Sequence, residues 1–163
     1  MRVSFNLLPS SWILKGYDYE RAKLEYYFEG EELERKLVDL DYVNIEENQR
    51  QHLYLDQKYK FLSNKELERQ ILYLDLENEK ISSETFERSL ININYPDIKE
   101  NRIQHLLLDF NYGKISDEVY KRNLIDINYP TIKENRVQHL LLDYKLNKIS
   151  KRKFNKKMKK ELK

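Results

Sequence analysis

The three histidines of this chain occupy one recurring motif, E-N-x-x-Q-H-L-x-L-D, in which an aspartate follows each histidine by four residues. The pairs are His52–Asp56, His105–Asp109 and His139–Asp143. Side chains four residues apart lie on one face of a helix, so each pair could supply two metal ligands or take part in proton transfer. A metal ion would need further ligands from another element, and equivalent residues of packed repeats lie roughly 10 Å apart. We therefore expect each His–Asp pair to support its own repeat, with the imidazole against the neighbouring repeat.

No other arrangement of residues indicates catalysis. The chain has no glycine-rich phosphate loop, no G-x-S-x-G nucleophile elbow and no H-E-x-x-H zinc motif. The stretch Y-G-K-I-S around Gly113 is similar to the second half of a calcium loop, but Val119 stands where that loop needs its bidentate glutamate. With three glycines and no cysteine, tight cofactor cradles are hard to build and thiolate metal sites are excluded. We predict that the protein is not an enzyme and binds no cofactor, metal ion or small-molecule substrate.

The elements that position these residues belong to a tandem repeat with a period of 34 residues. Segments 90–123 and 124–157 are identical at 20 of 34 aligned positions, and a diverged copy begins at Leu37. The diverged copy starts 53 residues before the next one, and the extra 19 residues hold one more Leu-Asp-x5-Ile-Ser element, which we interpret as an inserted hairpin arm. A chain built from copies of one small unit is usually a scaffold for contacts.

Each copy is predicted to be a pair of helices joined by a short turn. Capping-box patterns place the start of the first helix at Ile45, Ile98 and Ile132. The second helix is expected to begin after a serine, namely Ser63, Ser82, Ser116 or Ser150. Segment 91–95 alternates like a strand, but we assign it to a helix because the apolar seam from Phe86 continues through it.

The first helix of each copy should bury a single apolar stripe. Its residues are Ile103, Leu106, Leu107 and Phe110 in one copy and Val137, Leu140, Leu141 and Tyr144 in the next. In the diverged copy Arg50 interrupts the stripe, so that helix should be less buried.

The sequence thus predicts an all-α protein in which tandem helix–turn–helix hairpins form an elongated, solenoid-like array. Residues 1–36 are predicted to form a degenerate hairpin covered by an N-terminal cap, which consists of the apolar stretch 1–16. Residues 37–89 form the diverged repeat with its inserted arm, and residues 90–123 form the second repeat. Residues 124–163 form the third repeat and end in a basic helix.

Parts of the chain resemble known families. The 34-residue period is similar to that of tetratricopeptide-type repeats, but those need small residues where their helices cross, and Ala22 is the only alanine here. Segment 106–124, with the sequence LLLDFNYGKISDEVYKRNL, resembles the short helical hairpin called SHOCT, in which an L-x-x-L helix, a G-x-I-[ST] turn and an E-[FY] helix follow one another. That resemblance implies a module for association. The whole chain, with W-I-L-K-G at Trp12–Gly16 ahead of acidic hairpins, is similar to small proteins of large tailed phages.

Charge is distributed unevenly along the chain. Residues 145–163 hold ten basic residues and one acidic residue, a net charge of +9, whereas residues 1–144 hold 20 basic and 27 acidic residues, a net charge of −7. The basic tail could neutralise nucleic-acid phosphates or dock on an acidic protein surface. Phe154 is its only aromatic residue, so base stacking finds no support.

We predict a non-catalytic protein that binds a protein partner or a second copy of itself, as a structural or adaptor component of a larger assembly. The alternative is a nucleic-acid-associated protein that binds phosphates through its tail. The candidate contact residues are Arg102, Gln104, Arg136, Gln138, Lys151, Arg152, Lys153, Lys156, Lys157, Lys159 and Lys160. Without a signal peptide or an apolar run near the ~18 residues that span a bilayer, we expect a cytoplasmic protein that binds no membrane. If a phage encodes it, the place would be the host cytoplasm or the virion.

Overall fold

The computed structural model describes residues 16–162, and this range is all-α, with nine helices and no strand. The helices are α1 (Tyr17–Tyr27), α2 (Gly30–Asp41), α3 (Ile45–Lys58), α4 (Asn64–Glu77), α5 (Ser83–Asn94), α6 (Ile98–Asn111), α7 (Asp117–Asn128), α8 (Ile132–Lys145) and α9 (Lys151–Glu161). The stretch 91–94, which alternates like a strand, is helical as predicted. The predicted N-terminal cap lies, apart from Gly16, outside the described residues. Among the described helices, none combines the length and the apolar character that a membrane span requires.

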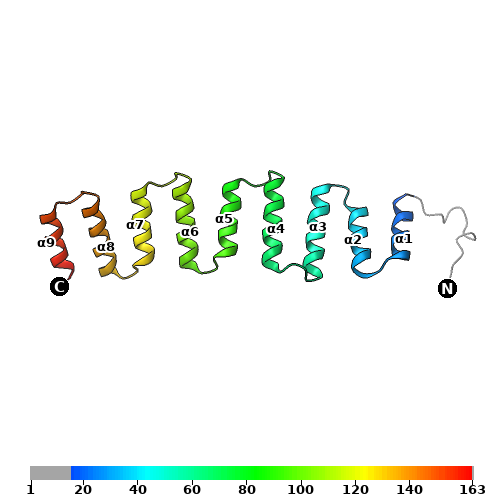
Figure 1. Ribbon diagram of the computed structural model, residues 1–163, viewed down its shortest axis with the longest axis horizontal. Coiled ribbons are helices and arrows are strands. Elements are labelled where there is room, and N and C mark those ends of the chain that lie inside the picture. The colour runs from blue at the N-terminus through cyan, green and yellow to red at the C-terminus, as the bar shows by residue number, and fades with distance from the viewer. Residues whose placement is uncertain (1–15, 163) are drawn as a thin grey trace, which may run out of the picture. The chain divides into compact units, whose positions relative to one another are not determined.

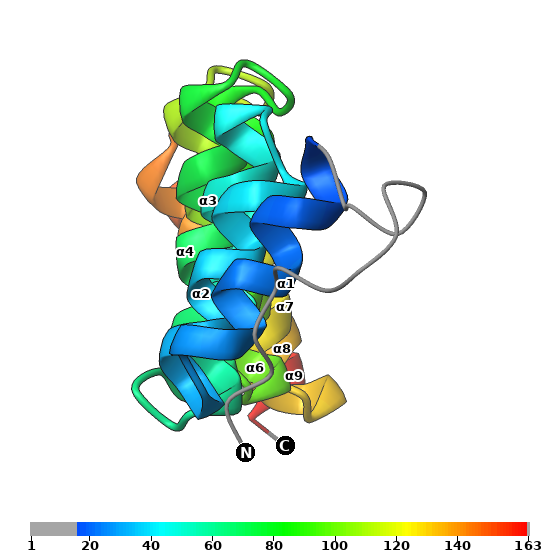
Figure 2. The same cartoon turned by 90° about the vertical axis from the view of Figure 1, so that its right-hand side faces the viewer.

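The chain divides into two compact units, Met1–Phe86 and Glu87–Lys163, and the division falls within α5. In the N-terminal unit, α1 to α4 each pack against their neighbours in the chain. Figure 2 turns α1 towards the viewer, with α2 and α3 behind it. In the C-terminal unit α6 to α9 pack in the same way, and the α7–α8 loop lies at the opposite edge from the α6–α7 and α8–α9 loops (Figure 1). An internal helix of either unit therefore has a neighbour on two sides.

The first helices begin where local capping predicts. They start at Ile45, Ile98 and Ile132. The side chains of Asn44 and Asp97 accept a hydrogen bond from the backbone N–H three residues on, at 3.0 and 2.9 Å. Thr131 departs from the prediction, because it makes no such cap and its hydroxyl donates to the Glu134 carboxylate instead. Side chains close to the helix ends thus decide where these helices start.

Each predicted serine lies just ahead of a second helix. The hydroxyl oxygens of Ser63, Ser82, Ser116 and Ser150 accept a hydrogen bond from the backbone N–H three residues later. Ser63 and Glu66 also form the complete reciprocal capping box. Gly30 opens α2 with a φ of 58°, a conformation that glycine adopts more readily than any other residue.

Leucine forms the core, and the first helices bury it on two sides. The buried residues of the described range are Leu55, Leu74, Leu106, Leu108, Leu140 and Leu142. The predicted stripe is right for Leu106 and Leu140, but it is wrong to place Leu107 and Leu141 in the core instead of Leu108 and Leu142. Residues two apart on a helix point about 200° apart. Leu106 and Leu108 therefore face opposite sides of α6, as a helix between two neighbours requires.

Two stacked aromatic pairs repeat each other in the C-terminal unit. The rings of Phe110 on α6 and Tyr120 on α7 lie 5.0 Å apart, and those of Tyr144 on α8 and Phe154 on α9 lie 4.6 Å apart. Each pair joins a first helix to the second helix that follows it. Equivalent residues of the two copies therefore make equivalent contacts.

The substitutions Leu108→Ala and Leu142→Ala test this two-sided core. Each is expected to lower the free energy of unfolding by about 2–5 kcal/mol, because each leaves a cavity on the side of the helix that a single stripe would leave exposed. Ile98→Ala is the matched control on α6, since Ile98 is 78% exposed, and it should change stability by less than about 0.5 kcal/mol. Urea titration followed by circular dichroism measures both effects. Equal losses at Leu108 and Ile98 would contradict the two-sided core.

Candidate functional site

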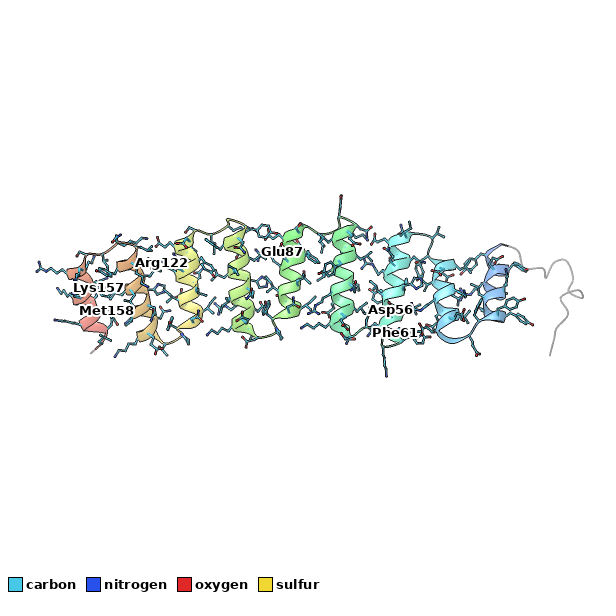
Figure 3. The ribbon with its side chains drawn as sticks, in the orientation of Figure 1. Asp56, Phe61, Glu87, Arg122, Lys157 and Met158 are labelled. Atoms are coloured by element: carbon cyan, nitrogen blue, oxygen red, sulfur yellow. The ribbon has the colours of Figure 1, made fainter. Side chains whose placement is uncertain are left out.

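Recurring Arg–Asp ion pairs join α2 to α3, α5 to α6 and α7 to α8. The pairs are Arg35–Asp56 at 2.6 Å, Arg88–Asp109, and Arg122–Asp143 at 2.5 Å, each separated by 21 residues. Figure 3 shows Arg122 between α7 and α8. The aspartate of the E-N-x-x-Q-H-L-x-L-D motif thus accepts from an arginine of the preceding helix. It is not the partner of the histidine four residues earlier, as the sequence suggested.

The histidines reach back 13 residues to the helix that precedes them. Their Nε2 atoms lie 2.7 Å from Asp39 Oδ1 (His52), 2.8 Å from Asn92 Oδ1 (His105) and 2.7 Å from Asp126 Oδ1 (His139). An asparagine four residues before each histidine donates to the same oxygen and to a backbone carbonyl of the preceding loop. Each imidazole therefore helps to hold its own helix against the one before it.

These contacts stabilise the charged forms of their partners. The hydrogen bond from His139, and after it the one from Asn135, lowers the pKa of Asp126 below its ordinary value. In the N-terminal unit His52 and Asn48 lower the pKa of Asp39 in the same way. The middle copy carries Asn92 at this position, so its hydrogen bond to the histidine has no ionisable acceptor.

A third kind of contact joins the turn after α8 to α7 and the turn after α4 to α3. Glu118, in the first turn of α7, pairs with Lys148 in the turn after α8, and this contact lowers the pKa of Glu118. In the N-terminal unit Glu46, in the first turn of α3, pairs with Lys80 in the turn after α4. Ion pairs thus connect the turns of the chain to neighbouring helices.

The repeated polar side chains contact neighbouring helices, although Nδ1 of His105 is buried without a hydrogen-bond partner among the described residues. The two ring nitrogens of His139 face Asp126 and, at 3.4 Å, the Arg122 guanidinium, so neither is turned to a substrate. Residues 16–162 contain no group of three or more His, Asp or Glu side chains that could hold a metal ion. The arrangement can fix the register of neighbouring helices, which is a structural task.

The candidate contact residues of the first helices do not share one face. Arg102 on α6 and Arg136 on α8 are exposed, whereas Gln104 and Gln138 are half-buried. Residues two positions apart on a helix are rotated by about 200° about its axis. The arginine and the glutamine of one helix therefore point in nearly opposite directions. Gln104 also donates to Glu100 within α6 at 2.8 Å. One flat partner can therefore contact the arginines or the glutamines, and the arginines are the more accessible.

An isoleucine one turn before each arginine is exposed, which the sequence analysis missed. Ile98 is 78% exposed and Ile132 is 72% exposed, and Ile45 at the same position of α3 is 77% exposed. A single exposed apolar side chain is normal on a protein surface. Its recurrence at one repeat position is not explained by packing. The available signal was the identical I-K-x-x-R stretch outside the predicted apolar stripe.

A lysine completes each of these exposed clusters. Lys99 and Lys133, next to the isoleucines, are exposed as well. We call the two clusters the first-turn patches; they consist of Ile98, Lys99 and Arg102 on α6 and of Ile132, Lys133 and Arg136 on α8.

The cations predicted in the tail lie on the exposed surface of α9. Phe154 and Met158 are half-buried, and Phe154 stacks on Tyr144 of α8; Met158 and Lys157 are labelled in Figure 3. The exposed cations are Lys151, Arg152, Lys153, Lys156, Lys157, Lys159 and Lys160. Within residues 16–162, no carboxylate forms an ion pair with any of them. Cations this close together repel one another, and the surface that they form attracts molecules of negative charge.

The chain matches no protein-family model, no curated protein and no solved structure. What the protein does therefore has to be inferred from its exposed residues.

Asp126→Asn is expected to weaken the acid dependence of folding. Because the pKa of Asp126 is lowered in the folded protein, its contribution is present above the unfolded-state pKa, about 3.9, and is lost as pH falls through the folded-state value. The thermal midpoint should therefore drop less between about pH 6 and about pH 3 in this variant than in the wild type.

The reciprocal variant provides the control. Asn92→Asp places a carboxylate opposite His105, at the position of Asp126 in the next copy, and should increase the acid dependence. Thermal unfolding at both pH values measures the two effects. If both variants kept the acid dependence of the wild type, the histidine-linked carboxylates would not contribute to stability.

Proposed function

We propose that the protein is a non-catalytic binding protein, a tandem array of helical hairpins that serves as a structural or adaptor component of a larger assembly. It binds an elongated protein partner through the first-turn patches of α6 and α8. The single observation that carries this proposal is the recurrence of exposed residues that have no packing task. The recurring residues Arg122, Asp143, Asn135 and His139 are, by contrast, used between neighbouring helices.

The two patches suit one partner because they face the same way. α6 and α8 make equivalent contacts with the helices around them, through the Arg–Asp pairs on one side and the aromatic pairs on the other. Equivalent residues therefore point in equivalent directions. α7 lies between the two helices, so the patches are roughly 20 Å apart, twice the usual spacing of packed helices. A partner that contacts both must extend over that length.

The composition of the patches indicates the chemistry of the partner. Each patch combines one exposed isoleucine with two cations. An apolar contact surrounded by carboxylates would complement it. The diverged copy keeps Ile45, but Glu46 and Gln49 replace the two cations, and Glu46 is engaged with Lys80. The C-terminal unit therefore carries both complete patches.

Photocrosslinking from the two faces of the first helices tests this proposal. A photoreactive residue at position 102 or 136 is compared with the same residue at 104 or 138, in cells that produce the protein. We expect a discrete crosslinked species from positions 102 and 136, because these side chains are exposed beside the isoleucines. Light scattering of the purified protein then shows whether the crosslinked species is a second copy.

The variant Ile98→Asp with Ile132→Asp serves as the specificity control. It should fold, since both side chains are largely exposed, and it should reduce crosslinking from position 102 by about tenfold, the effect of about 1.4 kcal/mol of binding energy. Equal crosslinking from both faces, or crosslinking unaffected by the aspartates, would refute a partner on the first-turn patches.

A further inference from the structure

The second helices α2, α5 and α7 carry the same four residue types towards the helix that follows. A glutamate is followed by an arginine four residues on, by valine or isoleucine three residues later, and then by aspartate or asparagine. In α7 these residues are Glu118, Arg122, Ile125 and Asp126. The three polar ones contact Lys148, Asp143 and His139 of the α8 hairpin. This face of a second helix is therefore a surface on which another helix packs.

At the repeat-equivalent positions α9 carries only cations. Arg152, Lys156, Lys159 and Lys160 stand 34 residues after the four residues of α7. Arg152, Lys156 and Lys159 point away from Phe154 and Met158, which are half-buried like their α7 equivalents Tyr120 and Leu124. Together with Lys151 and Asn155, these three line an open depression on the surface of α9. The face that packs against another helix in α7 thus carries only positive charge in α9. No carboxylate within residues 16–162 forms an ion pair with it.

We propose that this outer face of α9 docks an acidic helix of a partner protein. The inference rests on the proposed function, since it assigns a second contact surface to the same binding protein. The first helix of another hairpin of this chain does not fit, because it would bring the equivalent of Lys148 against Arg152 and the equivalent of His139 against Lys160. Like charges at one contact and a lost acceptor at the other disfavour that arrangement. A fitting partner carries carboxylates at the positions of His139 and Asp143 on its helix and at the position of Lys148 in the turn that follows.

Two observations favour a protein helix over nucleic acid. The equivalent face of α7 holds a helix, so the α9 cations stand at positions from which α7 contacts one. The only aromatic residue of α9, Phe154, is stacked on Tyr144 and is not free to stack on a base. Phosphate binding would use all the cations of α9, whereas helix docking uses those of one face.

The probe is the swapped peptide, a copy of α8 and the turn after it with two residues replaced by glutamate. The peptide has the sequence of residues 131–150 with His139→Glu and Lys148→Glu, and a lactam bridge between positions 132 and 136, which are exposed in α8, keeps it helical. The control peptide carries the bridge but keeps His139 and Lys148. We expect the swapped peptide to bind the full-length protein, measured by fluorescence anisotropy, at least about tenfold more tightly than the control, as expected when like-charge contacts become attractive.

Two protein variants of equal charge locate the binding face. The outer-face variant is Arg152→Glu with Lys156→Glu. The side-face variant is Lys153→Glu with Lys157→Glu, at positions whose α7 equivalents, Val119 and Asn123, are exposed and not covered by α8. The outer-face variant should bind the swapped peptide at least about tenfold more weakly than the wild type, and the side-face variant within about twofold of it. Circular dichroism confirms that both variants are folded.

A short single-stranded DNA oligonucleotide separates the two kinds of partner. Because phosphate binding follows the number of neutralised charges, it should weaken equally in both variants. Peptide binding that falls equally in both variants, no binding of the swapped peptide to the wild type, or DNA binding lost only from the outer-face variant would each overturn the proposal. None of these results bears on the first-turn patches, whose crosslinking test does not involve α9.

Discussion

Packing between chain neighbours is the constraint on which the rest of this structure depends. Within each unit a helix contacts the helix before it and the helix after it, so the layer is one helix thick. The described residues accordingly include six buried leucines and no fully buried side chain. Leucine contacts of this kind hold helices together without fixing how far one helix is shifted along the next. The Arg122–Asp143 pair, with side chains 30% and 28% exposed, lies at such a contact and adds a specific register.

This constraint explains why residues that resemble a reactive site act as structural contacts. A histidine and an aspartate one turn apart on a helix could share a metal ion or a proton. Here the two side chains are held by different groups of the preceding helix, His139 by Asp126 and Asp143 by Arg122. Both contacts recur where α3, α6 and α8 pack on the helix before them. Recurrence alone therefore does not separate the two kinds of polar residue in this chain. Exposure distinguishes residues such as Arg102 and Arg136 from those that contact a neighbouring helix.

The parts of the fold that depend on local sequence could be predicted, and those that depend on neighbours could not. The starts of α3 and α6 follow from cap residues and the turns from serines, since both act within a few residues. The second buried leucine, Leu108, was missed because a one-sided stripe assumes one neighbour. The partners at separations of 13 and 21 residues were missed because helix packing brings them together. The exposed cations of α9 were predictable, because their density leaves too few apolar positions to bury them.

α7 and α9 differ in the charge pattern that they carry at equivalent repeat positions. On α7 the face that packs on α8 alternates in charge, with Glu118, Arg122 and Asp126. Their partners are Lys148, Asp143 and His139 of α8 and the turn after it. Mixed charge of this kind makes the chain's own hairpins complementary to one another. The face of a single sign on α9 loses that complementarity and gains attraction for carboxylates. The substitutions between α7 and α9 thus make the equivalent face of α9 unsuited to the chain's own hairpins and complementary to carboxylates.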